Sequence, residues 1–193
     1  MSEAVVLLDG GYVDYILSAF GRPAIDYQKF SDELCRRSGG YTRFRTYYYH
    51  CPPFRSSPPK PEEQAKYANW QRFYEALKRH DRFEVRLGKL EWRACPKCGE
   101  GRPRQKRVDS QLAIDLVRLA AKGRVAKAIL VAGDSDHAPA VKMAKEDSIL
   151  VAVWHLPGNP RTVAHTELLD LCDERNPITQ DLITASLRQA THP

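Results

Sequence analysis

The sequence predicts an α/β fold in which helices cover both faces of a parallel sheet. Two short apolar runs, residues 5–8 and 128–132, have the length and β-branched content of strands that are buried on both faces. Each run ends abruptly in glycine and aspartate, and segments with helical spacing lie between the predicted strands. Alternation of this kind is typical of a sheet built from strand-helix-strand units.

The predicted helices are set by apolar residues at helical spacing and by their start and stop signals. A helix beginning at Gly10 would end near Gly21, and the next would end at the glycine pair 39–40. Pro61 starts the third well, because proline tolerates the first helical position and two glutamates follow it. The predicted helices cover about residues 10–21, 26–38, 61–80, 108–122, 138–145, 162–172 and 178–190.

The remaining strands are predicted from aromatic and β-branched content, over residues 43–49, 83–90 and 149–154. Residues 52–61 hold five of the thirteen prolines and are predicted to form a loop. Residues 91–107 read as a basic insertion, and the helices at about 162–190 close the fold. We therefore expect residues 1–193 to form a single domain.

Composition restricts the partners and the compartment. The chain has 193 residues, a formal net charge of +6 and a pI near 9.1, which favours an anionic partner. It has no apolar run long enough to span a membrane and no signal-peptide pattern, so we expect a cytoplasmic protein without a membrane partner. The cysteines are odd in number and unevenly spaced, which argues against a disulfide framework. They are Cys35, Cys51, Cys95, Cys98 and Cys172.

Aspartates follow the two apolar strands, where open parallel sheets bind their ligands. Asp9 ends the first strand, and Asp134 and Asp136 follow the second. Asp109 lies near the middle of the apolar face at the start of a helix, and from there it would point towards these strand ends. Carboxylates gathered in this way suit Mg²⁺ or Mn²⁺, which could activate water against a phosphate. Asp115 is a lesser candidate, because Arg118 three residues later could pair with it.

The structural alternatives are local. Asp9, Asp134 and Asp136 could cap turns, and Asp109 could be the N-cap of the helix that follows it.

Cys95 and Cys98 have the spacing of a zinc knuckle, with Gly99 after the second thiol. One pair supplies only two of four zinc ligands, and His50 and Cys51 could complete the set. The alternative is a reduced pair in a surface loop. Cys35 and Cys172 lie in apolar helical patterns and are predicted to be core residues.

A basic segment leads into Asp109 and could contact phosphates beside the metal pocket. Its candidate nucleic-acid contacts are Arg102, Arg104, Lys106 and Arg107, to which His137 is added as a phosphate contact or proton carrier. A solvated charged loop is the alternative. The aromatic residues Tyr47, Tyr48, Trp70 and Trp92 could stack on bases, although core packing is the more common role.

Three stretches, taken in order, resemble the NYN domain of the LabA-like group in the PIN-like nuclease superfamily. They are residues 5–11, residues 106–116 and residues 130–141. The resemblance implies a PIN-like three-layer α/β/α sandwich with a mainly parallel sheet. It also implies metal-dependent phosphodiester cleavage, usually of RNA, with the metal-binding acids Asp9, Asp109, Asp134 and Asp136.

Two positions depart from the pattern of this family. Tyr12 stands where related chains often carry asparagine, and His137 stands where many carry phenylalanine.

The leading hypothesis is therefore an endoribonuclease dependent on Mg²⁺ or Mn²⁺, acting on RNA, with DNA as a possible substrate and a homodimer as a possible state. The rival is a nucleic-acid-binding or regulatory module that has lost catalysis, which the change at Tyr12 motivates. A phosphatase would need a second aspartate at position 11, where glycine stands, and a Toprim-type domain would need glutamate at position 9.

Overall fold

A six-stranded, fully parallel sheet forms the centre of the molecule. The computed structural model describes residues 2–94 and 101–189. The strands are β1 (Glu3–Asp9), β2 (Thr42–His50), β3 (Phe83–Leu87), β6 (Lys127–Val131), β7 (Leu150–His155) and β8 (Glu174–Pro177). Their order across the sheet is β3-β2-β1-β6-β7-β8. The predicted parallel sheet is confirmed.

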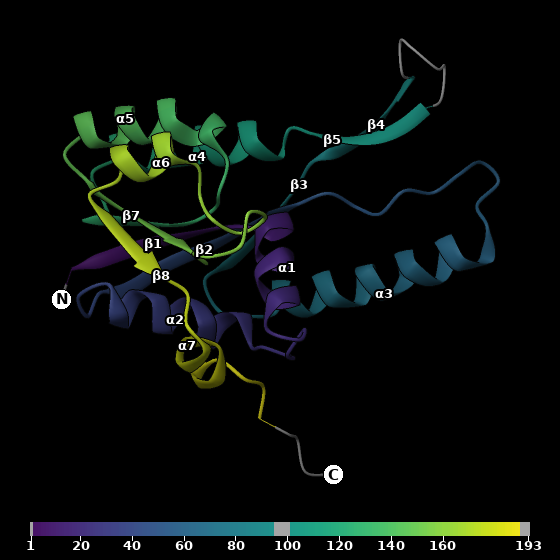
Figure 1. Ribbon diagram of the computed structural model, residues 1–193, viewed down its shortest axis with the longest axis horizontal. Coiled ribbons are helices and arrows are strands. Elements are labelled where there is room, and N and C mark those ends of the chain that lie inside the picture. Colours follow the sequence, from purple (N-terminus) through teal and green to yellow (C-terminus); the bar gives the residue numbers. More distant parts are fainter. Residues whose placement is uncertain (1, 95–100, 190–193) are drawn as a thin grey trace.

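Helices cover both faces of this sheet and complete the three-layer sandwich (Figure 1). One layer holds α4 (Val108–Ala121), α5 (Ala138–Glu146) and α6 (Thr166–Leu171). The other holds α1 (Gly10–Ala19), α2 (Tyr27–Arg37), α3 (Pro61–Lys78) and α7 (Gln180–Ala185). A separate apolar core lies under each layer, so both faces of the sheet are buried.

The alternation of side chains along β1 decides where its last residue points. Val5 and Leu7 pack in the core beneath α4, whereas Val6 and Leu8 pack in the opposite core. Side chains alternate along a strand, so Asp9, which follows Leu8, is directed towards the α4 layer. The buried sequence of β1 thus delivers a carboxylate to the α4 side of the sheet edge.

The chain order creates a crevice between β1 and β6. From β1 the chain builds β2 and β3 on one side, then returns through α4 to build β6, β7 and β8 on the other. Leu8 pairs with Val131, so the loops after β1 and β6 leave the sheet side by side. A reversal of strand order of this kind is where α/β sheets bind ligands, beyond the carboxyl ends of the strands.

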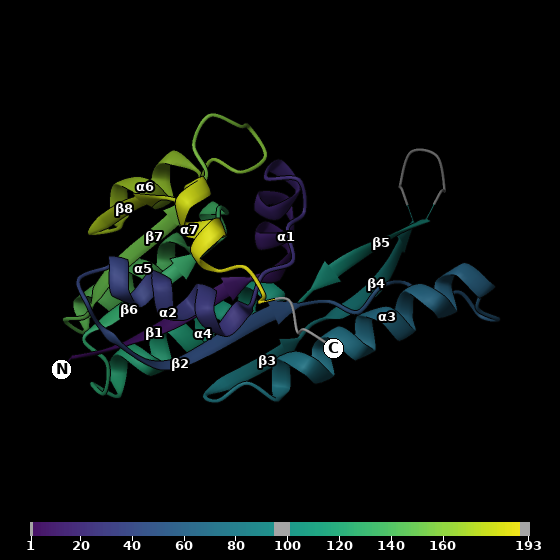
Figure 2. The same ribbon diagram turned by 90° about the horizontal axis from the view of Figure 1, so that it is seen from below.

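Part of the chain projects from the sandwich as a two-stranded antiparallel hairpin (Figure 2). Its strands are β4 (Lys89–Ala94) and β5 (Gly101–Lys106). The single strand predicted over 83–90 is wrong, because the backbone leaves the sheet at Gly88. A Cβ at Gly88 would lie 2.6 Å from the carbonyl oxygen of Lys106, so the chain can turn there only without a side chain. The described part of the predicted basic insertion therefore belongs largely to this hairpin.

The two closing helices are shorter than predicted. The segments 162–172 and 178–190 contribute only α6 and α7, and β8 lies between these helices. β8 pairs with β7 at the edge of the sheet, from Ala152 opposite Glu174 to His155 opposite Pro177. No helix within residues 2–94 and 101–189 has the length and hydropathy needed to cross a membrane.

Candidate metal centre and nucleic-acid cleft

A cleft of about 940 Å³ opens at the carboxyl end of β1 and β6. Its walls come from the start of α1, the end of β2, the start of α4 and the loops after β6 and β7. The acids among its lining residues are Asp9, Asp14, Asp109 and Asp134. The predicted position of the site, at the ends of the two apolar strands, is therefore where the cavity lies.

The Asp9 side chain caps helix α1 at the base of this cleft. Its Oδ1 accepts hydrogen bonds from the backbone N–H groups of Gly11 at 2.9 Å and Tyr12 at 3.2 Å, which caps α1. Burial raises the pKa of the Asp9 carboxyl above its ordinary value and nearby Asp109 adds to this, while the N–H of Tyr12 acts in the opposite direction. One carboxylate oxygen is thus fixed by the helix start, while Oδ2 accepts no hydrogen bond from the residues that the structure describes.

Asp109 and His137 complete a compact group with Asp9. The three side chains each offer one ligand atom, and these atoms lie within 4.8 Å of one another. Asp109 is the second residue of α4, and Arg107 occupies the N-cap position, so the alternative of Asp109 as N-cap is wrong. His137 is fully buried, and neither of its ring nitrogens has a hydrogen-bond partner in the described part of the chain. Two acids and an unpartnered imidazole form a donor set that fits a divalent cation.

Asp136 lies on a short 3-10 helix, η1 (Ser135–His137), and Asp134 is the N-cap residue of this helix. Their side chains have different surroundings. Asp134 caps η1 by accepting the N–H of Asp136 at 3.0 Å, and it also lines the cleft. Asp136 is exposed and belongs neither to the cleft lining nor to the three-residue group. The structure therefore brings Asp9, Asp109 and Asp134 to the lining of one cleft. The buried His137, rather than Asp136, joins Asp9 and Asp109 in the compact group.

Comparison with known families identifies the fold around this cleft. The sequence model of the NYN domain matches residues 3–178. This chain belongs to the NYN domain family. That family is part of the PIN-like nuclease superfamily, so the predicted resemblance is confirmed at this level, while the LabA-like assignment stays a prediction. A comparison with curated proteins finds no match.

Asp115 of the NYN domain is a structural residue, which corrects its place among the metal candidates. It is buried, and Oδ2 accepts hydrogen bonds from the Tyr49 hydroxyl at 3.1 Å and from Arg86 at 3.3 Å. Its Oδ1 accepts a bond from Arg118 at 3.0 Å, which is the partner the sequence indicated. Oδ2 therefore holds α4 against β2 and β3, while Oδ1 is occupied by a partner on α4 itself.

Tyr12, at the position where related chains often carry asparagine, lines the cleft and fixes one of its walls. Its hydroxyl donates a hydrogen bond to the carbonyl of Thr162, in the loop that follows β7. Burial raises the pKa of this phenol, so it remains a neutral donor. Its ring lies so close to Gly133 that a Cβ there would come within 2.5 Å of the ring.

Gly133→Ala is expected to lower the free energy of unfolding by about 1–3 kcal/mol, because either the Tyr12 ring or the loop carrying Asp134 must move. Urea titration of both proteins measures this change. Gly11→Ala is the control, because a Cβ at Gly11 would lie at an ordinary contact distance of 3.4 Å from its nearest neighbour, Asp9 Oδ1. Gly123→Ala would not serve, because the φ of +60° at Gly123 strains any other residue. An unchanged free energy for Gly133→Ala would contradict the tight packing.

Only two of the four predicted zinc ligands, His50 and Cys51, lie in the described part of the chain. Cys95 and Cys98 lie outside the described residues. The supporting pair is wrong in its geometry, because Cys51 is buried in the core beneath α4 while His50 stacks on Tyr48 on the other side of the strand. Cys35 and Cys172 are buried free thiols, as predicted.

The predicted nucleic-acid contacts are only partly described. Arg102 and Arg104 lie on β5, but their side chains are not described, nor is that of Trp92 on β4. Lys106 and Arg107 are exposed where β5 leads into α4, directly before Asp109. Tyr47 and Tyr48 are buried and Trp70 packs on Tyr74, so these three aromatic residues belong to the core.

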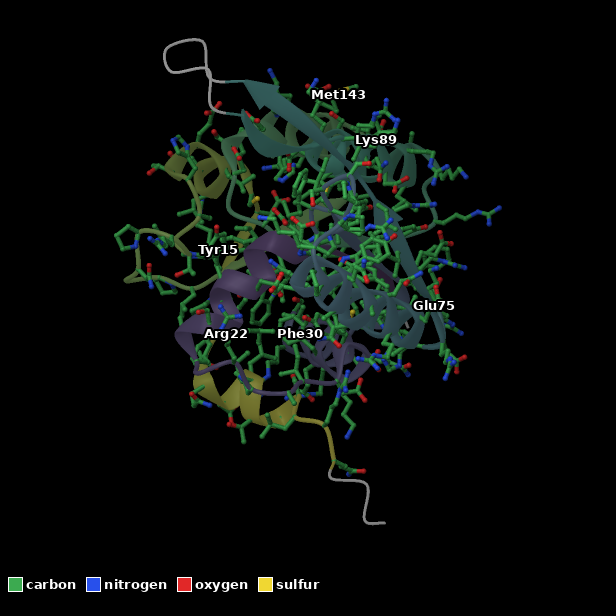
Figure 3. All side chains as sticks on the ribbon, turned by 90° about the vertical axis from the view of Figure 1, so that its right-hand side faces the viewer. Tyr15, Arg22, Phe30, Glu75, Lys89 and Met143 are labelled. Atoms are coloured by element: carbon green, nitrogen blue, oxygen red, sulfur yellow. The ribbon has the colours of Figure 1, made fainter. Side chains whose placement is uncertain are left out.

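The cleft of the NYN domain also contains residues that the sequence did not single out for it. Arg22 and Arg161 line its rim, as does Tyr15, which is 55% exposed, and Figure 3 labels Tyr15 and Arg22 beside α1. His50 lines the wall and lies 3.3 Å from Asp14. Burial lowers the pKa of His50, but the hydrogen bond and charge of Asp14, the Cys51 carbonyl and the charge of Asp9 together outweigh it, so the pKa is raised overall. These residues come from four separate elements, which only folding brings together.

Proposed function

We propose that this NYN domain is a divalent-metal-dependent nuclease that cleaves RNA internally. The observation that carries the proposal is the meeting of Asp9, Asp109 and His137 at the strand edge of the cleft, with ligand atoms within 4.8 Å of one another. Without a cation, the two acids would repel each other and the phosphates of a substrate. Family membership supports the same activity.

Asp9, Asp109 and His137 would hold the cation, and Asp134 at the cleft wall could add a carboxylate from the α5 side. When bound, the cation supplies Lewis acidity that activates water and offsets charge on the scissile phosphate. The protein contributes orientation: α1 fixes Asp9 through two backbone bonds, and η1 fixes Asp134 through one. The site is thereby organised before a substrate arrives.

The surroundings of the acids suit a polyanion. Arg22 and Arg161 on the rim place cationic groups beside the acidic centre, and the raised pKa of His50 on the wall favours its protonated form. In the hairpin, Lys89 stands opposite Lys106 and Arg93 opposite Arg102. The two strands thus add basic residues that suit contact with a phosphate backbone. We infer that the hairpin extends the binding surface away from the cleft.

The rival function is nucleic-acid binding without cleavage. The residue at position 12 is the observation that favours this rival. The Tyr12 hydroxyl is bonded to the carbonyl of Thr162, so it adds no polar group beside Asp9. A circular single-stranded RNA distinguishes the two, because only an endonuclease can open a circle. We expect linear products with Mn²⁺ or Mg²⁺, none with a chelator, and slower cutting of a DNA circle. RNA that is bound and never opened under any divalent ion would overturn the nuclease proposal and support the rival.

A further inference from the structure

His137 is a buried side chain that the protein itself leaves unsatisfied. It is fully buried, yet both Nδ1 and Nε2 lack hydrogen-bond partners in the described part of the chain. Buried polar groups are nearly always paired, since leaving them unpaired costs free energy. A ring nitrogen of His137 lies within 4.8 Å of carboxylate oxygens of Asp9 and Asp109. A cation bound by all three side chains would give this nitrogen the partner that it lacks.

The local fold explains why this imidazole reaches the acids. Asp134 caps η1, and the single turn of η1 sends Asp136 to the surface and His137 inward. His137 is also the residue before α5, and η1 packs against the start of α4 as well as α5 and α6. The turn that carries His137 therefore lies among three helices, so its position does not depend on a substrate.

We propose that His137 makes the centre a mixed oxygen and nitrogen site that selects a first-row transition-metal ion, such as Mn²⁺, over Mg²⁺. The inference rests on the metal site of the proposed function. Mg²⁺ is a hard ion that keeps water and carboxylate oxygen around it, whereas imidazole nitrogen is a better ligand for the transition ions. A pocket of carboxylates alone would discriminate far less between the two ions. His137 thus sets the identity of the cofactor.

The test measures metal binding to the full chain without RNA. Calorimetric titration is expected to give a dissociation constant for Mn²⁺ at least about tenfold below that for Mg²⁺. Pulsed electron paramagnetic resonance of bound Mn²⁺ should show coupling to a ligand nitrogen. In His137→Asn, which offers an amide oxygen in a similar volume, the nitrogen coupling should vanish and the preference for Mn²⁺ should fall to a few-fold or less.

The controls separate His137 from the other histidines. His155→Asn removes another buried histidine, whose Nδ1 has no hydrogen-bond partner among the described residues, and His50→Asn removes one that lines the cleft. Both should keep the nitrogen coupling and the metal preference. His137→Phe is a second variant, because an apolar ring suits a buried site and tests the loss of the ligand if His137→Asn fails to fold.

The outcomes distinguish this inference from the proposed function. Wild-type protein that binds Mn²⁺ with no nitrogen coupling, or binds both ions equally, would overturn the role of His137 even where RNA is cleaved. Absence of any divalent binding would overturn the metal centre and the inference together. The wild-type spectrum alone can decide against the inference, so the test does not depend on the folding of a variant.

Discussion

Asp9→Asn is expected to reduce metal-dependent RNA cleavage by about 10³-fold, equivalent to about 4 kcal/mol of lost transition-state stabilisation. The change removes the charge of a carboxylate whose ligand atom lies within 4.8 Å of those of Asp109 and His137. Asparagine can still accept the N–H bonds of Gly11 and Tyr12, so the start of α1 should be preserved. Single-turnover rates with saturating Mn²⁺, together with the melting temperature, measure the two effects separately.

Asp26→Asn is the matched control for this change. Asp26 caps α2 in the same way, with Oδ1 accepting the N–H groups of Gln28 at 2.9 Å and Lys29 at 3.0 Å, but it does not line the cleft. We expect it to cleave RNA at the wild-type rate. Full activity in Asp9→Asn would remove the metal centre from the mechanism, and equal losses in both variants would reduce Asp9 to a helix cap.

The position of the cleft could be predicted because it follows from local pattern. Apolar strands that end in aspartate reveal themselves in a few consecutive residues, and parallel strands bring their carboxyl ends to one edge. Asp9 and Asp134 were found in this way. Asp109 required only the helical period in addition, which places it on the face of α4 that meets the sheet.

The side chain that joins Asp9 and Asp109 as a third candidate metal ligand could not be predicted from the spacing of residues in the sequence. Asp134, Asp136 and His137 are almost adjacent in sequence, and the type of turn after β6 alone decides which of them faces Asp9. Asp115 was also beyond prediction as a buried residue, because Tyr49 and Arg86 reach it from strands far away in the chain. Both outcomes depend on contacts between elements rather than on the residues themselves.

β8 shows the same limit for the fold. Its four residues, from Glu174 to Pro177, are polar or proline, and nothing in them favours a strand. Pairing with β7 imposes the extended backbone, so an edge strand of this kind becomes visible only once its neighbour is in place. The apolar sequences of β1 and β6 are enough to predict these buried strands, whereas the edge strand β8 forms because it pairs with β7.

Glu174→Gln is expected to lower the free energy of unfolding by about 2 kcal/mol and the melting temperature by about 4–8 °C. Glu174 accepts a bond from Lys127 Nζ at 2.6 Å, and this lysine is only 2% exposed at the start of β6. The Ser38 carbonyl at 2.7 Å and the ring of Tyr41 would remain as its partners. The loss falls below that of a fully buried pair, because Glu174 is 39% exposed and water can replace part of the interaction.

Two further variants decide whether this loss comes from a stranded charge. Asp181→Asn removes the acid of the Arg37–Asp181 pair, in which Asp181 is 81% exposed, and should change the free energy of unfolding by less than about 0.5 kcal/mol. Lys127→Met combined with Glu174→Gln should recover most of the stability, because an apolar side chain of similar length needs no counter-charge. If the double variant is as unstable as Glu174→Gln, the glutamate instead acts through its own contacts at the edge of the sheet. Urea titration of the wild-type protein, the single variants Glu174→Gln and Lys127→Met, and the double variant gives the coupling energy directly.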